Sequence, residues 1–72
     1  MPVIDMMATG QKIKDMITKA GMTMREAADI MGVTPMACSK WVNGKTMPTI
    51  DNMVIIAHIC GVTVNDIIVI AG

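Results

Sequence analysis

The sequence predicts an all-α domain of five short helices joined by connections of a few residues. Threonines that can cap helix N-termini open each apolar-periodic segment: Thr9, Thr23, Thr34, Thr49 and Thr63. Glycines, which readily adopt the left-handed backbone that often follows a helix, close the first four: Gly21, Gly32, Gly44 and Gly61. A chain of 72 residues accommodates one domain, which we assign to residues 1–72, with residues 1–8 as an N-terminal arm.

The first two segments have the apolar spacing of amphipathic helices. Behind Thr9, the run Gln11–Ala20 is expected to bury one face, made of Ile13, Met16, Ile17 and Ala20. Thr23 is followed three residues later by Glu26, the spacing of a capping box. The inner face of this second helix is expected to contain Ala27, Ala28, Met31 and, less clearly from its phase, Ile30.

The third segment begins at Thr34 with Pro35 at the first helical position, where the missing N–H has no intrahelical partner to lose. Its phase turns Cys38, Trp41 and Val42 inward. Trp41 also has the chemistry to stack on single-stranded bases, but the inward phase favours a place in the core. Asn43-Gly44 ends the helix, and Asn43 suits a helix end because it tolerates left-handed backbone geometry.

The fourth and fifth segments are the most apolar. The predicted buried stripe of the fourth is Ile50, Met53, Val54, Ala57 and Cys60. Thr63, with Asp66 three residues later, opens the fifth, in which Ile67, Ile68 and Ile70 follow. An alternative remains for the chain ends, because Val3–Met7 and Ile67–Ile70 are rich in branched residues and suit two short paired strands.

Composition narrows the function. Six basic and six acidic residues give zero formal net charge, so any DNA affinity must come from local charge placement. Two cysteines and one histidine, His58, are too few for a structural zinc site, and we expect free thiols, no metal, no cofactor, no small-molecule ligand and a solvent-facing His58. Met1–Ala8 lacks a basic n-region and no run is long enough to span a membrane, which predicts a cytoplasmic protein.

Residues 24–43 contain the functional signal. Two helices are joined by the tight turn Gly32-Val33-Thr34, with small Ala28 at their crossing and Val33 among the apolar residues that hold them together. From Thr23 to Ile68 the chain resembles the phage repressor/Cro-type (XRE-like) helix-turn-helix family, through T-x-x-E-x-A, G-V-T, W-x-N-G-K-x-x-P and A-x-x-x-G-V-T-x-x-D. The resemblance implies a compact five-helix repressor-like DNA-binding domain.

The resemblance also implies working positions. Base contacts would come from Pro35, Met36, Ser39 and Lys40. Phosphate contacts would come from Thr23 and Met24, through free N–H groups at the start of the second helix, and from Asn43, Lys45 and Thr46. Met24 replaces a common glutamine and Val42 a common glutamate, which points to fewer hydrogen bonds with DNA than is usual in the family.

The sequence has more apolar residues than a small monomer needs. We predict a homodimer interface made of Ile55, Ile59, Val62, Val64, Ile67 and Ile68. The predicted function is a transcriptional regulator that binds a palindromic double-stranded DNA operator as a dimer and represses by occluding it. The alternative is a protein-interaction module, antitoxin-like or partner-binding, on the same fold. The sequence shows neither a nucleophile–base pair nor a phosphate-binding glycine loop, and we therefore do not expect an enzyme.

Overall fold

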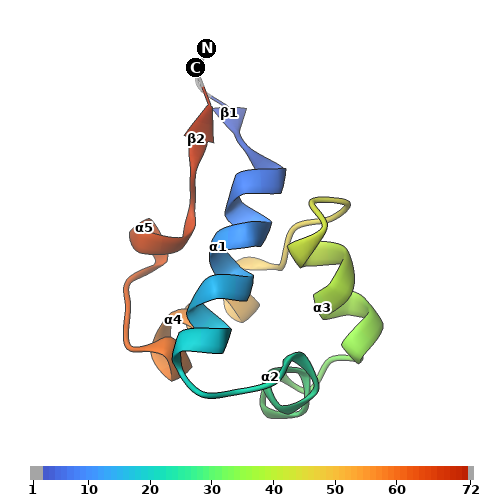
Figure 1. The fold of residues 1–72 in the computed structure, drawn as a ribbon. Helices are drawn as coiled ribbons and strands as arrows, with labels where there is room; N and C mark the ends of the chain where they lie inside the picture. The colour runs from blue at the N-terminus through green and yellow to red at the C-terminus, as the bar shows by residue number, and fades with distance from the viewer. Residues whose placement is uncertain (1–2, 72) are drawn as a thin grey trace.

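The structure is a computed structural model that describes residues 3–71. Within that range it contains five helices and one two-stranded ribbon, so the predicted all-α class is confirmed (Figure 1). The helices are α1 (Met6–Lys19), α2 (Met24–Met31), α3 (Pro35–Val42), α4 (Ile50–Cys60) and α5 (Val64–Ile67). The strands are β1 (Val3–Ile4) and β2 (Ile70–Ala71).

Four of the five predicted threonine caps are confirmed. The hydroxyls of Thr23, Thr34, Thr49 and Thr63 accept hydrogen bonds from backbone N–H groups three residues later, over 3.1 to 3.3 Å. At α5 the box is complete, because the Thr63 N–H donates to the Asp66 carboxylate over 2.9 Å. The N–H and hydroxyl of Thr63, with Lys12 nearby, lower the pKa of Asp66.

The predicted start of the first helix is wrong. Asp5 is the N-cap, with its carboxylate accepting from the Ala8 N–H over 2.9 Å, and α1 therefore begins three residues before Thr9. Thr9 lies inside α1 with no exposed surface, and its hydroxyl accepts a hydrogen bond from the Val69 N–H over 3.0 Å. Its hydroxyl satisfies the hydrogen-bonding need of a backbone N–H in the C-terminal segment, a role that only the tertiary structure creates.

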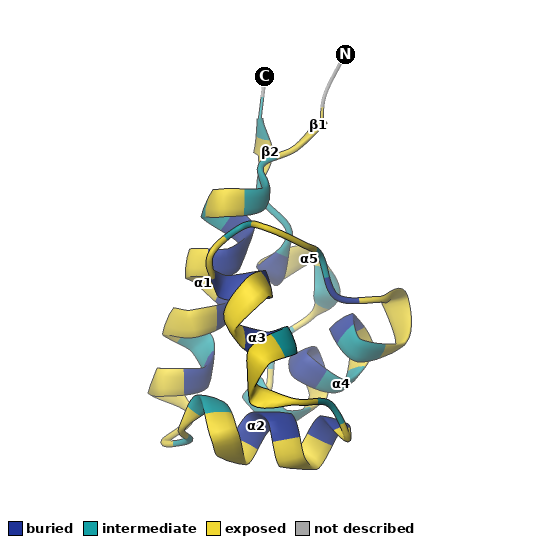
Figure 2. Cartoon of the chain, turned by 90° about the vertical axis from the view of Figure 1, so that its right-hand side faces the viewer, coloured by how far each residue is buried: buried dark blue, intermediate teal, exposed yellow. Residues whose placement is uncertain are grey.

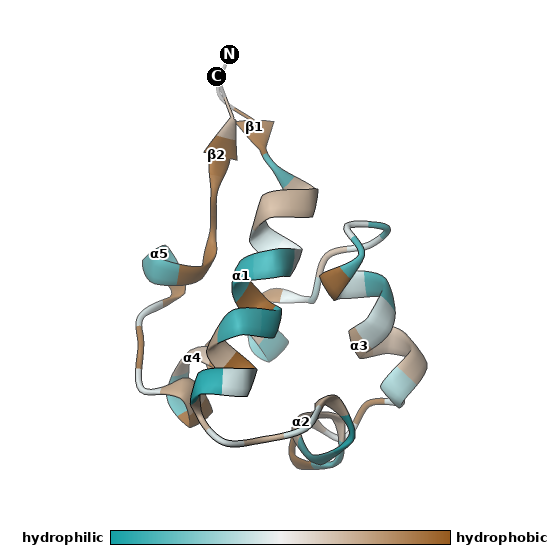
Figure 3. Cartoon of the chain, viewed as in Figure 1, coloured by the Kyte–Doolittle hydropathy of each residue, from teal (hydrophilic) through white to brown (hydrophobic). Residues whose placement is uncertain are grey.

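The alternative of paired terminal strands is correct over a shorter span. Val3 and Ile4 pair antiparallel with Ala71 and Ile70 in the ribbon that leaves the helical body (Figure 3). The Asp5 N–H extends the pairing by donating to the Val69 carbonyl over 2.8 Å. The predicted N-terminal arm of residues 1–8 therefore needs correction from residue 3 onward, because the chain there forms β1 and the first turn of α1. Residues 1 and 2 lie outside the described range.

The core lies between α1 and the other helices, and Figure 2 shows the buried faces turned toward it. Six of its apolar side chains have no exposed surface: Ile13, Ala27, Ala28, Cys38, Ile56 and Ile67. Trp41 is 5% exposed and belongs to this core, as predicted, while His58 is exposed.

The predicted inner faces of three helices need correction. On α1, Met16 is only half-buried, and Ala20, which follows the helix as its C-cap, is exposed; on α2, Ile30 is 56% exposed. On α4 the buried residues are Met53, Ile56 and Ala57, while Cys60 is half-buried and Ile50 and Val54 are 73% and 54% exposed. Eight of the eleven residues of α4 are apolar, so its contacts with α1, α2 and α5 set its rotation, and periodicity does not.

Two glycines set the distance between α1 and the end of α3. A Cβ at Gly10, inside α1, would lie 2.2 Å from the Trp41 carbonyl oxygen and 2.9 Å from that of Val42. A Cβ at Gly44, whose φ is +71°, would lie 2.9 Å from the Cα of Met7. These close approaches fix the C-terminal end of α3 against α1 and so determine how α3 is presented.

Candidate DNA-binding surface

The paired helices α2 and α3 are joined by a tight turn. Gly32 takes a left-handed conformation, with φ of 70°, and the Val33 N–H donates to the Ala28 carbonyl over 3.0 Å. Ala28 has no exposed surface, in agreement with the small residue predicted where the helices cross. The pair holds the opposite side of α3 toward solvent (Figure 2).

The four predicted base-contact residues share this outer side of α3. Pro35, Met36, Ser39 and Lys40 are all exposed. The Asn43 amide donates to the Ser39 hydroxyl over 3.3 Å, which ties the end of α3 to its exposed face. Base edges in the major groove are contacted by the N-terminal residues of a recognition helix, where Pro35 and Met36 lie, and Ser39 and Lys40 continue the exposed side one turn further on.

The predicted phosphate contacts divide into two groups. Asn43, Lys45 and Thr46 have exposed side chains on the loop after α3. The N–H groups of Lys45 and Thr46 both donate to the Lys40 carbonyl, over 2.9 and 3.4 Å, so the loop folds back on the helix end. This places two lysines from adjacent segments near the same end of α3.

At the start of α2 the prediction of a free N–H on Thr23 is wrong. The Thr23 N–H donates to the Glu26 carboxylate over 3.1 Å, and its hydroxyl accepts from the Glu26 N–H over 3.1 Å. The capping box uses both groups internally and brings a carboxylate to this end, where a phosphate would be repelled. Met24 is half-buried and packs against the core.

Charge is distributed unevenly along the chain. Between Ile30 and Ile50 there are two lysines, Lys40 and Lys45, and no aspartate or glutamate. The acidic residues of α2 and α4, such as Asp29 and Asp51, flank this stretch. Local placement can therefore make the α3 surface cationic in a chain of zero net charge.

The predicted dimer interface needs one correction. Ile67 has no exposed surface, because it is taken up by the core of its own chain. The other five residues are half-buried and pack against that core: Ile55, Ile59, Val62, Val64 and Ile68.

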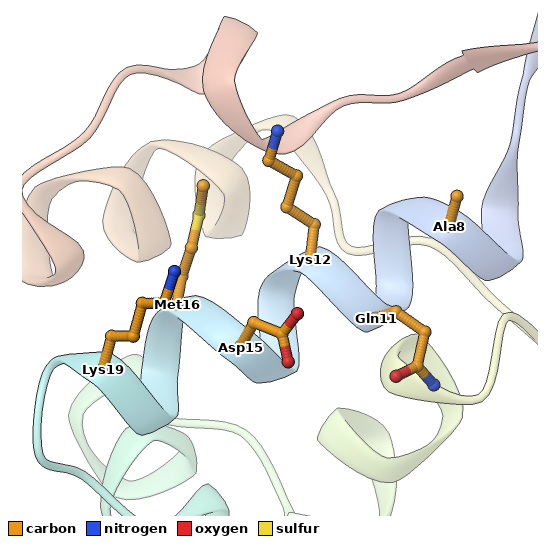
Figure 4. Close-up of a pocket in the computed structure, with 6 residues that line it drawn as sticks. All are labelled: Ala8, Gln11, Lys12, Asp15, Met16 and Lys19. Atoms are coloured by element: carbon orange, nitrogen blue, oxygen red, sulfur yellow. The ribbon is translucent and has the colours of Figure 1, made fainter.

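Other chemistry on the described residues is sparse. Burial raises the pKa of the Cys38 and Cys60 thiols, which are free. Residues 3–71 contain no cluster of three or more potential metal ligands, and none of their helices is long and apolar enough to cross a membrane. A groove of about 500 Å³ runs along α1, and Figure 4 shows Lys12 and Met16 on the opposite side of the helix from Gln11. Because one helix supplies all of its lining residues, this groove is an open surface feature.

The bundle and its α2–turn–α3 unit define the class of protein as a helix-turn-helix domain. Residues 13–67 match the model of the family described as Helix-turn-helix. The chain therefore belongs to that family, which confirms its resemblance to repressor/Cro-type (XRE-like) proteins. No curated protein sequence matches the chain.

Solved structures share the fold. The clp gene regulator ClgR from C. glutamicum is 24% identical over 85% of this chain and 78% of its own, with a TM-score of 0.76. The restriction-modification controller protein C.AhdI from Aeromonas hydrophila is 16% identical over 88% of this chain and 96% of its own, with a TM-score of 0.79. Hydroxypropylphosphonic acid epoxidase from S. wedmorenis is 25% identical over 93% of this chain, with a TM-score of 0.81, but the chain spans only 36% of that enzyme.

Proposed function

We propose that the chain is a transcriptional regulator that binds a specific double-stranded DNA sequence through α3. The observation that carries the proposal is the exposed, acid-free face of α3 within a helix-turn-helix unit: Pro35, Met36, Ser39 and Lys40. Lys40 can donate to guanine O6 and N7 in the major groove. Asn43, Lys45 and Thr46 bind the adjacent phosphates and fix the orientation of α3 on the duplex.

We further propose that the regulator works as a homodimer on a palindromic operator and represses by occluding it. The half-buried residues of α4, α5 and the tail form the interface: Ile55, Ile59, Val62, Val64 and Ile68. A two-fold dimer would place two copies of α3 about 34–36 Å apart, one turn of DNA. Light scattering at micromolar concentration tests this, with twice the chain mass expected and a single chain mass contradicting it.

Selection from a randomised duplex pool at roughly 50 mM salt, where phosphate contacts are strong, tests the main proposal. We expect an inverted repeat to be enriched. Lys40→Ala should relax one or two positions in each half-site, whereas Lys45→Ala should weaken binding to all sequences alike and lower the salt slope by about 1. Failure to enrich or bind any duplex would contradict the proposal.

A protein-interaction module on the same fold is the second candidate. The family's fold forms about a third of an epoxidase, with 36% of that chain matched, and this chain has zero net charge. Exposed Ile50 and Val54 on α4 offer an apolar contact for a partner. This candidate is favoured if the chain binds no DNA and Ile50→Asp abolishes capture of a partner that the wild type retains.

A further inference from the structure

The first turn of α3 offers a base edge almost no hydrogen-bonding group. Pro35 has no N–H. The Ala37 N–H is already held by the hydroxyl of Thr34 over 3.2 Å and by its carbonyl oxygen over 3.1 Å. What this turn presents outward is apolar: the ring of Pro35 and the thioether of Met36, whose side chain is 69% exposed.

An apolar probe in the major groove discriminates among bases in one way. The C5-methyl of thymine is the largest apolar group on the major-groove edges of the four bases, where cytosine has only a C5–H and the other recognition groups are hydrogen-bond donors and acceptors. Packing a thioether on those polar groups would remove their water without replacing its hydrogen bonds. Packing it on the methyl group buries apolar surface at no such cost.

We propose that Met36 makes α3 a reader of 5-methylpyrimidines: each half-site carries a thymine whose methyl group packs against the Met36 thioether. This inference rests on the proposed function and specifies its ligand. 5-Methylcytosine carries a methyl at the same ring position, so methylation of a cytosine placed there strengthens binding.

The position of this thymine follows from the helix. Met36 and Lys40 are four residues apart on α3 and both exposed. At a rise of about 1.5 Å per residue their Cα atoms are separated by roughly 6 Å along the axis. Base pairs are spaced by about 3.4 Å. Because a helix in the major groove is inclined to the DNA axis, the thymine at Met36 and the guanine at Lys40 lie within about two base pairs of each other.

Replacing thymine by deoxyuridine removes the methyl group and leaves every hydrogen-bonding group in place. On the selected duplex, each thymine is replaced in turn, and affinity is measured by fluorescence anisotropy. We expect one position per half-site where the replacement weakens binding about fourfold, which is about 0.8 kcal/mol for one buried methyl group. Replacing the thymine there with cytosine weakens binding, and 5-methylcytosine at the same position binds about fourfold more tightly than cytosine.

Two variants test whether Met36 is the residue that contacts the thymine methyl group. Met36→Ala should bind the thymine and deoxyuridine duplexes equally, while Ile70→Ala, which removes an exposed apolar side chain from β2, should keep the wild-type ratio. Circular dichroism confirms that each variant is folded. A sequence-specific site with no thymine preference, or a preference that survives in Met36→Ala, overturns this inference alone. Absence of binding to any duplex overturns the proposed function as well.

Discussion

Replacement of Gly10 by alanine tests the contact that positions α3 against α1. The new Cβ would lie 2.2 Å from the Trp41 carbonyl oxygen, where ordinary contacts begin at 3.4 Å. Both nearest groups are backbone atoms at the end of α3, so the clash cannot be relieved by a side-chain rotation. Overpacking of this kind costs about 1–3 kcal/mol, and a rigid backbone neighbour places the cost at the upper end, about 3 kcal/mol.

Helix propensity acts in the opposite direction. Alanine is better than glycine inside a helix by about 1 kcal/mol, which leaves a net destabilisation of about 2 kcal/mol. For a domain of this size each kcal/mol lowers Tm by about 4–8 °C, so Gly10→Ala should melt roughly 8–16 °C below the wild type. Urea and thermal unfolding followed by circular dichroism measure both quantities.

A substitution at the neighbouring residue serves as a control without the steric clash. Gln11 is exposed on the same helix, and Gln11→Ala should change the free energy of unfolding by no more than about 0.5 kcal/mol. If Gly10→Ala instead stabilises the chain by about 1 kcal/mol, as an unobstructed helical glycine would, the close packing of α1 on α3 is refuted.

Three further predictions concern single contacts. Thr9→Val keeps the buried shape but leaves a backbone N–H of the C-terminal segment unpaired, and should lower the free energy of unfolding by about 1–3 kcal/mol in urea; an unchanged midpoint would contradict the bond. Gly44 and Gly32 share a left-handed φ, but only Gly44 has neighbours that a Cβ would strike. Gly44→Ala should therefore be less stable than Gly32→Ala by about 1 kcal/mol or more, and equal losses would refute the difference. The N–H and hydroxyl of Thr63 lower the pKa of Asp66, so its stabilisation is present above the carboxyl's ordinary pKa and is lost as pH falls through the lowered one. The unfolding midpoint is measured at pH 7 and at pH 3, and Asp66→Asn should remove the part of the loss of stability at pH 3 that comes from Asp66. If the substitution leaves the loss unaltered, the capping box is excluded as its source.

Local interactions made much of the fold predictable. The caps at Thr23, Thr34 and Thr63 each act over three residues, so the sequence pattern contains both partners. The same applies to Gly32 and Gly61, whose left-handed backbone ends a helix directly. These positions were enough to locate α2, the turn and α3, and hence the exposed face that forms the candidate site.

Contacts between distant segments were not predictable in this way. Thr9 resembled a cap, but its partner is Val69, 60 residues away. The largely apolar α4 allowed several rotations, and packing against α1, α2 and α5 selected one. In the site, the free N–H expected at Thr23 was lost to the capping box that the sequence had itself indicated through Glu26. Gly10, a glycine inside a helical run, was the available signal of a close approach between helices.

Backbone amide NMR of the chain titrated with duplex DNA at low salt tests the central claim most directly. It follows each N–H separately, and at low salt the phosphate contacts are strong enough for any duplex to bind. The account predicts shifts concentrated at Met36, Ser39 and Lys40 and in the loop 43–46, with the ribbon unaffected. Shifts confined to α4 or the ribbon, or no shifts at all, would contradict the assignment of α3 as the DNA-binding helix.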